Sequence, residues 1–166
     1  TGLGESINSP GDEGDPEITA MGDAAYFTRF SADGDADLYI ARRDGSGWGE
    51  PEPLPINTPD NEFGAALSPD GAWLYFASDR PGSIGGVDLW RSPLNEGTPG
   101  TPEPLGPSVN SPNDDISPTL STTEAADPGS GAVIPRTVLY FSSDRPTAEA
   151  GQGNAASGFD LYRSTD

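Results

Sequence analysis

The sequence predicts an all-β protein made of three repeated antiparallel sheets, and three observations support this prediction. Gly and Pro supply 22 and 18 of the 166 residues and recur every few positions, which favours short strands joined by tight turns. No segment keeps a helical period over three turns, and no apolar run reaches the roughly 18 residues of a membrane-spanning helix. The same phrase also introduces three similar segments: Ile7-Asn-Ser-Pro10, Ile56-Asn-Thr-Pro59 and Val109-Asn-Ser-Pro112.

The repeat period points to one architecture. The Asn residues of the three phrases are 49 and then 53 positions apart, close to the roughly 40–50 residues of one β-propeller blade. We therefore expect a single domain, residues 1–166, of three four-stranded antiparallel blades at about 9–54, 59–106 and 112–166. Such a chain is half a propeller, or part of a six-bladed propeller completed by another copy or by missing chain.

The second repeat predicts its strands most clearly. An innermost strand ends near Leu67, and the turn 68–71 (Ser-Pro-Asp-Gly) follows it. Residues 73–77 and 87–92 alternate and form the second and third strands. The proline-rich segment 50–54 of the first repeat is compatible only with an edge strand. Each second strand carries a Tyr-Phe pair, of which one member is expected to pack between blades: Tyr26-Phe27, Tyr75-Phe76 and Tyr140-Phe141.

These segments resemble a known repeat. Ser68-Pro-Asp-Gly71, Leu74-Tyr-Phe-Ala-Ser-Asp-Arg80 and Gly85-Gly-Val-Asp-Leu-Trp90 together are similar to the TolB-like, WD-like propeller repeat of bacterial periplasmic and envelope proteins. The third repeat matches well. The first matches in part, because Arg29-Phe-Ser31 replaces Ser-Asp-Arg. The resemblance implies an extracellular or periplasmic location in a bacterial envelope and a protein- or glycan-binding role.

The third repeat carries two insertions. One adds 12 residues within 122–136, and a shorter one lies near 148–157. Both are rich in Ala, Gly, Ser and Pro, so we expect surface loops.

Three blades form an arc, whereas closed propellers have about four to eight blades. The third repeat stops just after its third strand, and Leu3–Asn8 matches Leu105–Asn110, which ends an outer strand. We expect residues 1–8 to act as an outer strand donated to the last blade of another copy, giving a six-bladed dimer or a filament. The alternative is a fragment of a longer chain. The predicted interface residues are Leu3, Gly4, Glu5, Ser6, Ile7 and Asn8.

The composition excludes several classes of partner and of catalytic site. The chain has 27 Asp and Glu, eight basic residues that are all Arg, and a net charge of −19. That charge argues against nucleic acid and against anionic membranes as partners. The absence of His and Cys removes Ser-His-Asp and Cys-His catalysis. We therefore expect a non-enzymatic structural subunit that binds itself, without membrane insertion. The alternative is a module that binds an envelope protein or a glycan.

One acidic cluster is a candidate calcium site. Asp33, Asp35 and Asp37 stand at alternate positions, as at the start of an EF-hand loop. The sixth and twelfth positions are Leu38 and Asp44 instead of Gly and Glu, so the match fails there. Asp37 also aligns with Asp88 and Asp160 of the other repeats, which predicts a structural role. No other cofactor is expected.

Other charged residues recur at the repeat frequency. Asp79-Arg80 and Asp144-Arg145 occupy equivalent turns, where Asp would cap backbone N–H groups and Arg would pair locally. A ligand clamp is the alternative. Glu13, Glu62 and Asp115 also align, and they would either surround a central channel or form hydrogen bonds between blades.

Overall fold

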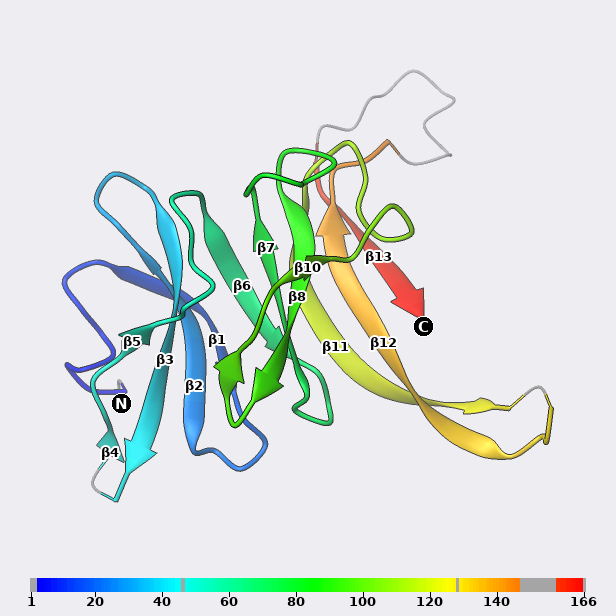
Figure 1. The fold of residues 1–166 in the computed structure, drawn as a ribbon, viewed down its shortest axis with the longest axis horizontal. Helices are drawn as coiled ribbons and strands as arrows, with labels where there is room; N and C mark the ends of the chain where they lie inside the picture. The colour runs from blue at the N-terminus through cyan, green and yellow to red at the C-terminus, as the bar shows by residue number, and fades with distance from the viewer. Residues whose placement is uncertain (1–2, 46, 128, 147–157, 166) are drawn as a thin grey trace.

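The computed structural model describes residues 3–45, 47–127, 129–146 and 158–165. These residues form three antiparallel β-sheets that lie side by side, in chain order from blue to red (Figure 1). In this part of the chain, no helix is long and apolar enough to cross a membrane. The predicted insertion at 148–157 lies outside the described residues.

Each sheet is a meander of three main strands. In the first two sheets, the third strand also pairs with two short segments, whereas the third sheet has three strands among the described residues. The first sheet contains β1 (Asp12–Ile18), β2 (Ala24–Phe30), β3 (Ala36–Asp44), β4 (Gly47–Trp48) and β5 (Glu52–Pro53). The second contains β6 (Glu62–Leu67), β7 (Trp73–Ser78), β8 (Asp88–Asn95), β9 (Thr98–Pro99) and β10 (Glu103–Pro104). The third contains β11 (Asp115–Ala126), β12 (Val133–Ser143) and β13 (Asp160–Thr165).

The proline-rich segments form edge strands, as the sequence predicts. β5 pairs with β3, and β10 pairs with β8, each through two residues. Proline has no N–H to donate to a second neighbour, so these outer strands stay short.

A bulge recurs in the innermost strand of every sheet. The pairing register shifts after Gly14, Phe63 and Ile116. Positive φ angles of 50°, 68° and 54° occur at the equivalent residues Asp15, Gly64 and Ser117. Together the three bulges line a cavity of about 240 Å³.

The core lies between the sheets. One buried cluster joins the first two sheets through Tyr26, Leu38, Phe76 and other residues, and a second joins the second and third sheets. Tyr75 belongs to the second cluster and Phe76 to the first. Both members of this Tyr-Phe pair therefore pack between sheets, on opposite faces, because adjacent strand residues alternate.

The insertion at 122–136 is not a loop, contrary to the prediction. It extends β11 and β12 into a long hairpin that reaches beyond the other sheets (Figure 1). Thr122 pairs with Thr137 and Ala125 pairs with Ile134. β-branched residues on both strands favour extended pairing despite the Gly and Pro around them.

Candidate assembly interface

The junction between the first and second sheets depends on one asparagine. The Asn57 side chain brackets the backbone of Leu38: its Oδ1 accepts from the Leu38 N–H at 3.2 Å, and its Nδ2 donates to the Leu38 carbonyl at 2.9 Å. The Leu54 N–H donates to the same carbonyl at 2.9 Å. Asn61 Oδ1 accepts from the Ala36 N–H at 3.0 Å. The backbone groups on the outward edge of β3 therefore form hydrogen bonds with the segment that leads into the second sheet.

The second junction repeats these bonds. Asn110 Oδ1 and Nδ2 bracket the Leu89 backbone, both at 3.0 Å. The Leu105 N–H donates to the Leu89 carbonyl at 3.1 Å. Asp114 Oδ1 accepts from the Val87 N–H at 2.9 Å. The recurrence makes this set of bonds, here called the asparagine junction, a property of the repeat.

A carboxylate at the start of each inner strand holds the lead-in segment, meaning residues 3–10, 54–59 and 105–112. Glu62 accepts from the Thr58 N–H and Oγ1, both at 2.7 Å, and forms an ion pair with Arg80 at 2.9 Å. Arg80 Nη2 also donates to the Ile56 carbonyl at 3.0 Å. Among the described residues, each of the carboxylates Glu13, Glu62 and Asp115 binds its own lead-in segment and an Arg.

The first sheet achieves the same contact from a different position. Arg29 pairs with Glu13 across β1 and β2, at the register position that Ser78 holds opposite Glu62. Its Nε is 3.1 Å from Glu13, and its Nη2 donates to the Ile7 carbonyl at 3.1 Å. The sequence comparison missed this role, because the expected Ser-Asp-Arg is absent there.

Each of these arginines also covers two aromatic rings. Arg29 lies over Phe27 and Tyr39, with its guanidinium carbon 5.7 and 4.7 Å from the ring centroids. Arg80 lies over Phe76 and Trp90 in the same way. Arg145 lies over Phe141 and Tyr162. Burial raises the pKa of Glu13, but hydrogen bonds from Ser9 and the Arg29 charge outweigh it and leave that pKa lowered.

The segment Leu3–Asn8 already has the turn found in the lead-in segment of the third sheet. The Asn8 N–H donates to the Gly4 carbonyl at 3.0 Å, as Asn110 does to Gly106 at 2.8 Å. Ile7 is buried against Phe27 and other residues of the first sheet. Asn8 itself is exposed, and its side chain has no hydrogen bond to the described residues, in contrast to Asn57 and Asn110.

The opposite end of the molecule has the complementary feature. Leu161 of β13 holds the register position of Leu38 and Leu89, opposite Ser142. Those two leucines are 0% exposed, whereas Leu161 is 85% exposed. Tyr140, on the same face, is 39% exposed, and no described strand pairs with the outer edge of β13. Figure 1 shows β13 at the end of the row of sheets, with this edge uncovered.

The turn carboxylates act inside the sheets. Asp79 accepts from the backbone N–H and side-chain Nδ2 of Asn61, at 2.7 and 2.9 Å. Asp144 accepts from the Asp114 N–H at 2.8 Å. Arg145 pairs with Asp115. All four residues of the Asp-Arg pairs therefore contact their own sheet or its lead-in segment.

The aligned carboxylates Asp37, Asp88 and Asp160 have different surroundings. Asp88 is fully buried and accepts from the N–H groups of Ile84 and Gly85. Burial, opposed by these bonds, raises the pKa of Asp88. Asp37 is half-buried at the start of β3, and burial, Glu62 and Asp35 raise its pKa. Asp160 is exposed.

The predicted calcium cluster does not converge. Asp33 and Asp35 are exposed in the β2–β3 turn, where their N–H groups donate to Ser31 Oγ at 3.2 and 3.1 Å. Among the described residues, no group of three or more carboxylates is placed to hold a metal ion. Calcium binding therefore stays a prediction.

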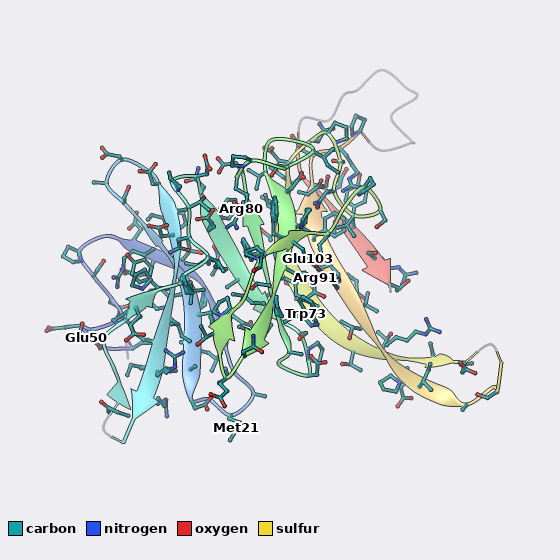
Figure 2. All side chains as sticks on the ribbon, viewed as in Figure 1. Met21, Glu50, Trp73, Arg80, Arg91 and Glu103 are labelled. Atoms are coloured by element: carbon teal, nitrogen blue, oxygen red, sulfur yellow. The ribbon has the colours of Figure 1, made fainter. Side chains whose placement is uncertain are left out.

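The outer strand of the second sheet is attached by its side chains. Arg91 forms an ion pair with Glu103 at 2.7 Å, and its guanidinium lies 4.4 Å from the Trp73 ring centroid. Figure 2 shows the three residues close together where β10 meets β8. This attachment orients the chain that continues into Leu105 and Asn110.

Comparisons with known proteins leave the family open. No protein-family model matches the chain, and no curated protein matches it either.

Sequence reasoning found the repeated phrase but missed what its asparagine does. It also missed Leu161 as the unburied member of a set of three. An alignment of the repeats would have indicated both roles, because the Asp-Leu pairs 37–38 and 88–89 precede Asn57 and Asn110 in the chain, and Asp160-Leu161 is the third such pair.

Proposed function

We propose that the three sheets are propeller blades and that the protein is a non-enzymatic structural subunit which assembles head to tail with copies of itself. The third sheet of one copy packs against the first sheet of the next, and Leu3–Asn8, which forms a turn and not a strand, binds the outer edge of β13 as 105–110 binds the outer edge of β8. Two copies give a six-bladed ring, and further addition gives a filament. An extracellular or envelope location follows from the resemblance to TolB-like repeats alone.

One observation carries the proposal: the same leucine position is 0% exposed in the first two sheets and 85% exposed in the third. An uncovered strand edge with an apolar face invites pairing with another chain. Leu3–Asn8 already has the turn of the segment 105–110, which covers this edge in the second sheet.

Light scattering across a concentration series, with electron microscopy of the same samples, tests the proposal. We expect the mass to rise with concentration to a dimer or a filament. Leu161→Asp should keep the fold and prevent the rise. Ile84→Asp, at another partly exposed apolar residue (46%), is the control and should assemble normally. A folded wild-type chain that stays monomeric at millimolar concentration would refute the proposal.

A specific observation favours a second candidate, a protein- or glycan-binding module. A cavity of about 680 Å³ opens between the ends of the first and second sheets. Its lining includes Ile18, Met21, Tyr26 and Arg42, an apolar surface with a few polar groups such as ligand sites use. A monomer that captures an envelope protein or glycan, and loses it on Met21→Asp, would favour this function.

A further inference from the structure

We infer that the contact between two copies is a third asparagine junction: Asn8 of one copy brackets the backbone of Leu161 in the next, and Asp12 accepts from the Phe159 N–H. This inference rests on the proposed assembly and names its register and its recognition residue. It predicts which backbone atoms meet, which the proposed function leaves open.

The donor side is organised before contact. Glu13 accepts from the Ser9 N–H at 3.1 Å, and Arg29 holds the Ile7 carbonyl at 3.1 Å. Asn8 follows the turn that begins at Gly4, as Asn110 follows the turn at Gly106. Because the segment is already ordered, binding costs little conformational entropy.

The acceptor side presents the matching atoms. Leu161 takes the register position of Leu89, and Phe159 directly precedes Asp160 as Val87 precedes Asp88. The N–H groups of Leu89 and Val87 bond to Asn110 and Asp114. Phe159 is 49% exposed. By this equivalence, the Leu161 N–H and carbonyl point away from β12, toward the uncovered edge.

A pair of glycines fits a third junction at this edge. Gly86 and Gly158 each stand two residues before the aligned Asp of the third strand. A Cβ at Gly86 would lie 2.4 Å from Asp114 Oδ1, whereas a Cβ at Gly158 meets nothing within 4 Å. In a third junction, Asp12 of the neighbouring copy would fill the space beside Gly158.

The junction would also select the partner. A bare strand edge accepts any extended segment. The asparagine must reach one N–H and one carbonyl of the same residue while Leu3 pairs with that carbonyl, so the register is set to a single position. A second copy of this chain fits that requirement through Leu3, Asn8 and Asp12.

The first test changes the donor in the full-length chain. Asn8→Asp removes the Nδ2 donor and sets a charge against the Leu161 carbonyl, so association should weaken about tenfold or more. Asn95→Asp adds the same charge at an exposed site, the last residue of β8, and should associate like wild type. The thermal midpoint of dilute monomer should be unchanged in both variants, because the Asn8 side chain has no bond to the described residues.

The second test changes the acceptor. Gly158→Val should leave the monomer folded and weaken association, because the new side chain occupies the space of Asp12 from the neighbour. Hydrogen exchange of the wild type gives a readout without mutation: the Leu161 and Phe159 amides should become protected only on assembly.

The outcomes separate this inference from the proposed function. If wild type assembles and Leu161→Asp does not, yet Asn8→Asp and Gly158→Val assemble normally, the asparagine junction is wrong and assembly stands. If the Leu161 amide stays unprotected in the assembled form, the junction is also wrong. A wild-type chain that remains monomeric overturns both.

Discussion

Leu89 and Leu161 occupy the same register position in β8 and β13, yet the first is 0% and the second 85% exposed. Leu89 is covered by the Asn110 lead-in and the third sheet, whereas no described residue covers the edge of β13. The same amino acid at one position of a repeat therefore has two different energetic roles.

The same substitution made at both leucines should have very unequal effects on the free energy of unfolding. Leu89→Asp buries an unpaired carboxylate and should lower the free energy of unfolding by about 4 kcal/mol or more. Leu161→Asp should change it little in dilute solution, where the side chain is in water. Urea unfolding at low protein concentration measures both. Equal destabilisation would mean that Leu161 is covered within the monomer.

The Arg80–Glu62 pair should matter far more than its exposed counterpart. Arg80→Met leaves the fully buried Glu62 carboxylate unpaired, which should cost about 3–5 kcal/mol. Arg91→Met breaks the partly exposed Arg91–Glu103 pair and should cost about 1 kcal/mol or less. Urea unfolding compares the two, and similar costs would contradict this account of the buried pair.

The recurring bulge predicts unequal effects of two conservative changes. Gly64 has φ 68°, so Gly64→Ala should destabilise the fold by about 1–2 kcal/mol. Ser117 has φ 54°, so Ser117→Gly relieves strain and should be neutral or stabilising. Thermal unfolding of the two variants measures both effects. A stabilising Gly64→Ala would show that the bulge does not require this conformation.

Glu17 should make stability fall as pH rises. Burial raises its pKa from the usual 4.5, opposed by a hydrogen bond from the Leu67 N–H. The folded state therefore holds this proton more tightly, and its stabilising effect, present below pH 4.5, is lost as pH rises through the folded-state pKa. Glu17→Gln should gain stability relative to wild type between about pH 4 and pH 7. A constant difference across that range would contradict the raised pKa.

Salt should strengthen assembly. Each chain carries a net charge of −19, so two copies repel one another. Raising the ionic strength from about 0.01 M to about 1 M shortens the screening length from about 30 Å to about 3 Å. Sedimentation at matched protein concentration should show more assembled protein at high salt. Weaker association at high salt would mean that ion pairs between copies outweigh the overall repulsion.

The repeated phrases and alternating segments predicted the strands well. The turn 68–71, the strand near 73–77 and the proline-rich edge strands follow from local backbone preferences, so short-range patterns were sufficient. The prediction of a loop at 122–136 was wrong, because pairing between β11 and β12 overrides a loop-like composition.

Arg29 shows why the site could be predicted only in part. Its guanidinium reaches Glu13 and the Ile7 carbonyl from the position that Ser78 holds in the second sheet, two residues earlier than Arg80. An alignment by residue type places Ser31 at the position of Arg80 and so misses the role of Arg29. Only the cross-strand register brings an arginine from a different position to the same carboxylate.

The sequence alone determined an all-β chain with a three-fold repeat, because turn residues and alternation act over a few positions. Tertiary structure decided which copies of a repeated residue are satisfied. Asn57 and Asn110 bracket buried strands, whereas Asn8 and Leu161 are left at opposite ends of the row of sheets. That difference arises because burial and hydrogen bonding depend on what lies beside a residue in space, which a repeat in sequence does not specify.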